Sequence, residues 1–274
     1  MKELHGKVAV ITGAASGFGR EFAIRCADEG MKVILTDIDT GGLDTTVALL
    51  KLGTESLVIG SDVSSADSIE HLARSTYDHF GACNLLFNNA GVGTAGPIWT
   101  ATLDDWKWTL GINVMGVVHG LRSFVPRMLA QKEESYIVNT ASAAGLLAPP
   151  GSGVYAASKH AVVAITECLY HELRDQNALI GVSVLCPAFV DTGISNSERN
   201  RLADSNPEAE QYSDRIRQAI KSGKLSAADV ARITIDAVKN ERFYILTHSN
   251  VKIAVEIRMN DILLDRQPTN TSQR

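Results

Sequence analysis

A tyrosine and a lysine stand four residues apart in the segment GVYAASKHA (153–161), within a run of small residues. On a helix, residues i and i+4 lie on one face, so Tyr155 and Lys159 would be neighbours. A phenol with a pKa of about 10 is a poor acid or base at neutral pH, but a nearby ammonium favours the phenolate and lowers that pKa. Such a tyrosine could take the proton of an alcohol while hydride leaves the carbinol carbon.

Two further polar residues could act with this pair. Ser142 ends a predicted strand over 136–142 and could hold the same substrate oxygen by a hydrogen bond. Asn113 lies inside a predicted long helix over 102–131, where asparagine often marks a kink or a water site. Open α/β sheets bind ligands at the carboxyl ends of their strands, so these residues can converge there.

The segment TGAASGFGR (12–20) places glycines 13, 17 and 19 between a buried strand and a helix. Glycine lets the backbone approach a pyrophosphate, and the helix N-terminus offers free N–H groups. Asp37 closes the next strand, where a carboxylate can accept hydrogen bonds from an adenine ribose and repel the 2′-phosphate of NADP. A tight turn and an unrelated aspartate are the alternative, which their joint occurrence at this distance disfavours. We therefore expect NAD, with NADP less favoured.

The elements that must position these residues alternate along the chain. Strands are predicted at 7–12, 32–37, 56–62, 84–91, 136–142 and 181–187, and helices at 18–29, 40–52, 65–80, 102–131 and 153–177. The strands are apolar runs rather than alternations, so both faces of their sheet should be covered. This order predicts an α/β fold with a doubly wound parallel sheet, Rossmann-like, in a single domain whose core is residues 1–192.

The chain becomes polar after Asp191, and residues 193–225 are interpreted as a substrate lid. Residues 226–274 should complete the same domain with a helix near 226–240, a strand over 242–247 and an amphipathic helix near 250–265. The terminal PTNTSQR (268–274) is expected to be frayed.

Composition excludes several classes of function. The net charge of −5 gives no basic excess for nucleic acid or an acidic membrane. No run approaches the roughly 18 apolar residues of a membrane span, and the N-terminus does not read as a signal peptide. The four cysteines form no CxxC and have no histidine at metal-ligand spacing, so no metal site is expected. A cytoplasmic location is the resulting expectation.

Taken together, several motifs strongly resemble the short-chain dehydrogenase/reductase family, in its shorter NAD(P)-dependent branch, over about residues 5–192. They are TGAASGFG, Asp37, Asp62-Val63, NNAG (88–91), Asn113, Ser142 and YAASK (155–159). The resemblance implies that Tyr155 is the acid/base and that Ser142 holds the substrate oxygen. It also implies that Lys159 binds the nicotinamide ribose and lowers the pKa of Tyr155, and that Asn113 holds a water in a proton relay through Lys159.

The same resemblance implies a cofactor site made of Gly13, Ser16, Gly17, Phe18, Gly19, Asp37, Ile38, Asp62, Val63, Asn89, Ala90, Gly91, Tyr155, Lys159, Pro187, Val190 and Thr192. Phe18 stands where the family usually has isoleucine, and Ala188 where it usually has glycine. The chain also lacks the family's common Gly-Asp-Gly ending, which supports tetramer contacts. A homodimer through 102–131 and 153–177 is therefore predicted, with a homotetramer as the alternative.

These features favour an NAD-dependent enzyme that interconverts a secondary alcohol and a ketone. The apolar segment AAGLLAPPGS (143–152) and Phe189 favour a hydrophobic or aromatic substrate, whereas Trp106 and Trp108 are expected to pack at the start of their helix. One alternative is a regulatory protein that binds NAD without turnover, although it would not need an acid/base. Another is a nucleotide-sugar epimerase or dehydratase, although those relatives are usually longer and carry a GxxGxxG loop.

Overall fold

The computed structural model describes residues 1–194, 212–214, 217–218 and 223–271, and one parallel sheet runs through them. Its strands are β1 (Val8–Thr12), β2 (Lys32–Asp37), β3 (Ser56–Gly60), β4 (Leu85–Asn88), β5 (Ser135–Thr140), β6 (Ile180–Cys186) and β7 (Tyr244–Leu246). They lie in the order β3-β2-β1-β4-β5-β6-β7, so the strand order reverses between β1 and β4. Such a switch point is where doubly wound sheets bind ligands.

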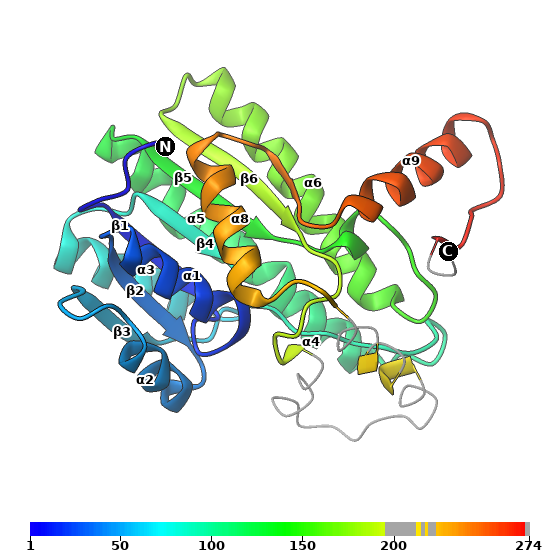
Figure 1. The fold of residues 1–274 in the computed structure, drawn as a ribbon, viewed down its shortest axis with the longest axis horizontal. Helices are drawn as coiled ribbons and strands as arrows, with labels where there is room; N and C mark the ends of the chain where they lie inside the picture. The colour runs from blue at the N-terminus through cyan, green and yellow to red at the C-terminus, as the bar shows by residue number, and fades with distance from the viewer. Residues whose placement is uncertain (195–211, 215–216, 219–222, 272–274) are drawn as a thin grey trace.

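Helices cover both faces of this sheet (Figure 1). One face carries α1 (Gly17–Asp28), α2 (Thr40–Ala48) and α8 (Ala227–Lys239). The other carries α3 (Ala66–Phe80), α4 (Leu103–Asn113), α5 (Met115–Gln131) and α6 (Gly153–Asp175). Every residue of β1, β4 and β5 is buried, as expected for strands that are covered on both sides. The predicted doubly wound, Rossmann-like fold is confirmed.

The prediction of one helix over 102–131 is wrong, because the chain forms two helices there. Helix α4 ends at Asn113 and α5 begins at Met115, with Val114 between them. The Asn113 side chain bonds a distant loop at this point: Oδ1 accepts from the Val92 amide at 2.8 Å, and Nδ2 donates to the Val92 carbonyl at 3.0 Å. Side-chain bonds of this kind compete with regular helix, and here they accompany the kink that an asparagine suggests.

The C-terminal elements lie close to their predicted places. Strand β7 extends the sheet beside β6, and α9 (Ser249–Leu263) follows it. Most of the predicted lid over 193–225 lies outside the described residues. The expected amphipathic packing of the last helix is wrong, since Val251 and Asp261 are the buried residues of α9.

The chain after α9 also differs from its predicted fraying. The Thr269 amide donates to Asp261 Oδ2 at 2.9 Å, so the described part of this tail is held against α9. None of the helices in the described ranges combines the length and the apolar character that crossing a bilayer requires.

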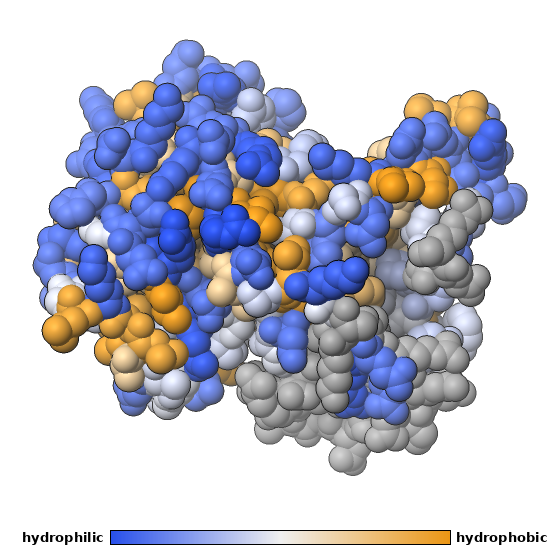
Figure 2. Space-filling view, viewed as in Figure 1, coloured by the Kyte–Doolittle hydropathy of each residue, from blue (hydrophilic) through white to orange (hydrophobic). Residues whose placement is uncertain are grey.

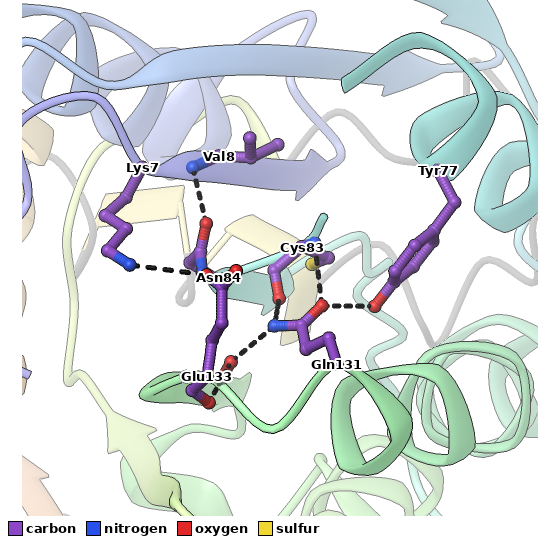
Figure 3. A network of polar contacts seen from close by, with 8 residues as sticks. Lys7, Val8, Tyr77, Cys83, Asn84, Gln131 and Glu133 are labelled. Atoms are coloured by element: carbon purple, nitrogen blue, oxygen red, sulfur yellow. Dashed lines mark hydrogen bonds and ion pairs between the residues drawn. The ribbon is translucent and has the colours of Figure 1, made fainter. Parts of the chain in front are cut away.

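A polar network joins the elements at the amino ends of the strands (Figure 3). Gln131, the last residue of α5, is its centre. Its Oε1 accepts from the Tyr77 hydroxyl at 2.8 Å and from the Cys83 amide at 3.2 Å. Its Nε2 donates to the Cys83 carbonyl at 2.8 Å and to Ser135 Oγ at 2.7 Å. One amide side chain therefore ties α3 and the entries to β4 and β5 to the end of α5.

A second set of contacts adjoins it in the same view. Glu133 Oε2 accepts from Lys7 Nζ at 3.3 Å and from Asn84 Nδ2 at 2.9 Å, while Asn84 Oδ1 accepts from the Val8 amide at 3.0 Å. These bonds hold the entries to β1 and β4 together. The whole network lies at the edge of the sheet opposite the carboxyl ends of its strands.

Replacing Gln131 with leucine should lower the free energy of unfolding by about 1–3 kcal/mol, because it leaves part-buried groups of Tyr77 and Cys83 without partners. Denaturant unfolding would measure the loss. The matched control is Gln176→Leu at the exposed residue that follows α6. An equal loss in both variants would contradict the role of the network.

Candidate active site

A cavity of about 1470 Å³ lies at the carboxyl ends of the strands. Residues that end or follow six successive strands line it: Gly13, Asp37, Ser61, Asn89, Ala141 and Pro187. This volume exceeds the roughly 300–1,000 Å³ of a usual small-molecule site, so it can hold two ligands side by side. All of the residues predicted for catalysis and cofactor binding line this cavity, except Gly19 and Asn113.

The glycine loop after β1 is shaped by close backbone approaches. Gly17 opens α1 with a φ of +52°, and a Cβ there would lie 2.7 Å from the Thr192 carbonyl oxygen. A methyl group at Gly19 would overlap the Gly13 carbonyl, which explains why Gly19 is needed although it does not line the cavity. Ser16, the N-cap of α1, makes no side-chain cap bond, so the first amides of the helix are available to an anion.

Asp37, at the end of β2, lies beside this loop. Its Oδ2 accepts from the Ala15 amide at 3.1 Å and its Oδ1 from the Asp39 amide at 3.1 Å. Each carboxylate oxygen keeps further acceptor capacity, and the residue lines the cavity. The side chain is therefore positioned to accept hydrogen bonds from a diol.

The predicted adenine end of the cavity combines apolar and polar groups. Ile38 is 56% exposed and Val63 is 8% exposed, and both line the cavity. The Asp62 side chain stabilises the local backbone, since its Oδ1 accepts from the Ser64 amide at 2.9 Å and from the Ser64 hydroxyl at 2.8 Å. These residues give a flat aromatic ring an apolar surface with a polar edge.

Asn89, after β4, acts as a brace between strand ends. Its Nδ2 donates to the Thr12 carbonyl at 2.9 Å, and its Oδ1 accepts from Thr140 Oγ1 at 3.2 Å. The hydroxyl of Thr12 also accepts from the amides of Asn89 and Ala90, at 2.8 and 3.0 Å. The predicted cofactor wall over 89–91 is thus fixed by the ends of β1 and β5.

Asn113 is 1% exposed and lies behind the cavity wall. Besides Val92, its Nδ2 contacts Ser158 Oγ at 3.0 Å, and Ser158 Oγ donates to the Tyr155 carbonyl at 2.7 Å. The side chain therefore joins the loop after β4 to the turn of α6 that carries Tyr155. Both Nδ2 hydrogens are thus engaged by protein groups, and Oδ1 already accepts one hydrogen bond.

Lys159 lies under the tyrosine. Its side chain is 2% exposed, Nζ donates to the Thr140 carbonyl at 2.9 Å, and Nζ lies 5.7 Å from the centroid of the Tyr155 ring. Burial disfavours the ammonium and lowers the pKa of Lys159 to about 8. A buried amine one helical turn from the phenol is the arrangement that the spacing predicts.

Tyr155 and Ser142 meet in front of this lysine. Burial raises the pKa of Tyr155, and a hydrogen bond with the Ser142 side chain acts in the opposite direction. In the protein alone, burial outweighs this hydrogen bond, so the lowered pKa expected for the tyrosine would require the cofactor's positive charge. Ser142 follows β5 and begins the short 3₁₀ helix η1 (Ala143–Gly145), with Oγ accepting from the Ala144 amide at 3.2 Å.

Sequence reasoning missed one part of the cavity. Trp108 lines it, although packing at the helix start was expected. So do residues of α9 and of the chain beyond it: Asn250, Val251, Ile253, Ala254, Ile257, Asn270 and Thr271. The helical pattern over 250–265 could reveal α9 itself, but no local signal in the sequence says that the helix returns to the site.

Comparison with known proteins agrees with this geometry. The family described as short chain dehydrogenase matches residues 7–203. A curated relative named CLA biosynthesis dehydrogenase/reductase, from Lactiplantibacillus plantarum, is 36% identical and covers 98% of this chain and 97% of its own. A 1-deoxy-11-beta-hydroxypentalenate dehydrogenase from Streptomyces exfoliatus is 32% identical over 94% of this chain and 89% of its own.

Among solved structures, a short chain dehydrogenase/reductase from Burkholderia phymatum is similar over 98% of both chains. It has 50% sequence identity and a TM-score of 0.96, and it was solved in complex with NAD.

Proposed function

This chain belongs to the short-chain dehydrogenase/reductase family, and on that basis we propose that it is an NAD-dependent oxidoreductase that interconverts a secondary alcohol and a ketone. The observation that carries the proposal is the convergence of Ser142, Tyr155 and Lys159 at one cavity. The tyrosine hydrogen-bonds with Ser142, and the lysine lies buried beneath it. A site of this kind offers a general acid/base beside a group that can hold the substrate oxygen.

The residues around the glycine loop fit a nicotinamide dinucleotide. The uncapped amides at the start of α1 would hold its pyrophosphate, and Asp37 would hold the adenine ribose. Ile38 and Val63 would contact the adenine, and Lys159 the nicotinamide ribose. When bound, this cofactor supplies the acceptor of a hydride in oxidation and the donor in reduction. The NAD in the similar Burkholderia phymatum structure supports the proposal.

The chain's own residues would manage the proton and the substrate oxygen. In oxidation, the Tyr155 phenolate takes the hydroxyl proton as the C–H bond gives up its hydride and the C=O bond forms. The Ser142 hydroxyl orients that oxygen. Lys159 favours the phenolate electrostatically, and Asn113 fixes the turn of α6 that carries the tyrosine. In reduction, the Tyr155 phenol returns its proton to the developing alkoxide.

The substrate side of the cavity supports an apolar substrate. Leu147, Pro149, Pro150 and Phe189 line it, and Phe189 is 50% exposed. A hydrophobic or aromatic substituent would cover these side chains, and burial of that apolar area favours binding.

The homodimer through α4, α5 and α6 stays a prediction, which light scattering would test. The lid over 193–225 also stays a prediction, which hydrogen exchange would test.

The direct test is to mix the protein with NAD and a panel of apolar secondary alcohols, and to follow NADH absorbance. Growth of that absorbance with at least one alcohol is the expected result. NAD binding without turnover on any alcohol or ketone would instead favour a regulatory protein. Turnover of nucleotide sugars alone would favour an epimerase or dehydratase.

The two directions of the reaction should respond oppositely to pH. Burial raises the pKa of Tyr155, so the phenolate that oxidation needs is scarce at neutral pH and grows as pH rises. The neighbouring thiol of Cys186, whose pKa burial raises to about 12, stays neutral over most of this range. We expect kcat/KM for alcohol oxidation to increase, and kcat/KM for ketone reduction to decrease, between about pH 6 and about pH 8, below the pKa of about 8 at which Lys159 loses the charge that favours the phenolate. A fall in oxidation over that range would contradict this assignment.

A further inference from the structure

The cavity does not stop at the catalytic residues but continues to the inner side of α9. Ile253, Ala254 and Ile257 of this helix line it. Residues at this spacing share one helical face. Ile253 is 61% exposed although it borders a cavity. An exposed isoleucine in such a place is apolar area that a ligand could remove from water.

The helix that carries these residues stands off the body of the protein. Figure 1 shows α9 projecting beside the sheet, and Figure 2 shows apolar atoms where it leaves the body and near its far end. Of the residues of α9, Val251 and Asp261 are buried. The side chains of Ile253 and Ile257 therefore contribute little to a packed core and are available to contact a ligand in the cavity.

The chain beyond α9 turns back toward the same cavity. Asp265 has a φ of +51°, which is a left-handed turn position. Asp261 then holds the returning chain: its carbonyl accepts from the Arg266 amide at 2.8 Å, and its Oδ2 accepts from the Thr269 amide at 2.9 Å. This return places Asn270 and Thr271 on the cavity wall. Helix α9 and its tail thus form one hydrogen-bonded unit bordering the site.

Charge is scarce in this part of the cavity. The charged residues among its described lining are Asp37, Asp62, Lys107 and Lys159. Asp37 and Asp62 belong to the proposed adenosine end, and Lys159 is buried under Tyr155. Lys107 is 77% exposed and lies 3.6 Å from Asp104. The described residues around α9 therefore offer apolar contacts and the neutral polar side chains of Asn250, Asn270 and Thr271.

We propose that the Ile253–Ile257 face of α9 is a specificity wall, which selects secondary alcohols or ketones carrying a long apolar substituent on the reacting carbon. The proposal rests on the proposed function and names its substrate class. The short end of the substrate meets Ser142 and Tyr155, and the far end of its substituent meets α9. Ile253 and Ile257 thus determine specificity and take no part in the chemical step.

The test uses alcohols that differ only in length, butan-2-ol and decan-2-ol, with NAD as the second substrate. Ile257→Ala should lower kcat/KM for decan-2-ol by about fivefold to tenfold, and should leave butan-2-ol within about twofold, because only the longer chain reaches the removed methyl groups. The matched control is Ile262→Ala on the same helix, at a side chain that is 57% exposed and does not line the cavity. This control variant should leave kcat/KM unchanged for both alcohols.

Equal losses on both alcohols, no loss on either, or the same loss in Ile262→Ala would overturn the specificity wall. Binding of decan-2-one in the presence of NAD, a pair that cannot react because neither partner carries the hydride, gives a second readout that does not depend on turnover. Its Kd should weaken by about fivefold to tenfold in Ile257→Ala, and an unchanged Kd would also overturn the wall. If no alcohol or ketone is turned over, the proposed function fails, and the binding comparison still decides the inference.

Discussion

Replacing Tyr155 with phenylalanine should lower kcat for alcohol oxidation by at least about 100-fold and leave NAD binding nearly intact, because a lost general acid/base costs this much. The substitution removes one hydroxyl and keeps the ring. The ring also keeps its place over Lys159, whose Nζ lies 5.7 Å from the ring centroid. Steady-state kinetics would measure the loss, and calorimetry with NAD would show that the cofactor site is preserved.

The matched control removes a tyrosine hydroxyl elsewhere. The Tyr244 hydroxyl donates to Glu167 Oε1 at 2.7 Å, and neither residue lines the cavity. Tyr244→Phe should therefore keep wild-type kinetics. If Tyr155→Phe retained more than about a tenth of the wild-type kcat, the assignment of Tyr155 as acid/base would be wrong.

The sheet and the predicted site residues could be found from the sequence because their signals are local. A buried apolar run that ends in a glycine loop specifies a strand, a turn and a helix within about twenty residues. The carboxyl ends of parallel strands meet at one edge, so Asp37, Asn89 and Ser142 had to converge once the strands were identified. Their roles in binding and catalysis stay proposals that kinetics must test.

The parts that could not be predicted depend on contacts between distant segments. The break between α4 and α5 accompanies bonds from Asn113 to Val92 and Ser158, which are 21 and 45 residues away. The wall at α9 likewise depends on where the helix lies in space, because its sequence pattern is compatible with packing on several surfaces. The return of the tail depends on one carboxylate, Asp261, meeting the Thr269 amide.

Preference for NAD over NADP is the remaining test with a large expected effect, and it concerns Asp37. NADP carries a 2′-phosphate with a charge of about −1.5 to −2 where NAD has a hydroxyl. A carboxylate about 4 Å away repels each unit charge by roughly 4 kcal/mol at an effective dielectric constant of about 20. Solvent and salt screen the ribose edge, so the net penalty is about 1–3 kcal/mol. We expect kcat/KM to favour NAD by at least about tenfold.

The structure places a cation near Asp37, and a cation there could oppose the preference for NAD over NADP. Arg20 on α1 donates to the Ala15 carbonyl through Nη2 and to Thr46 Oγ1 through Nε at 3.1 Å. Its guanidinium is thus engaged by two protein acceptors, and Arg20 is not among the residues that line the cavity. The carboxylate of Asp37, which does line the cavity, should therefore dominate the choice of cofactor.

Asp37→Asn removes the charge and keeps the size of the side chain, although its single oxygen can replace only one of the two carboxylate oxygens that accept from the Ala15 and Asp39 amides. This variant should reduce the preference for NAD by about tenfold, mainly through a gain in kcat/KM with NADP. The matched control is Asp39→Asn, which removes a nearby charge that does not line the cavity and keeps a residue able to cap α2 through the Gly42 amide. The Asp39→Asn variant should keep the wild-type preference for NAD over NADP. Equal efficiencies with the two cofactors in the wild-type protein would mean that Asp37 does not face the ribose.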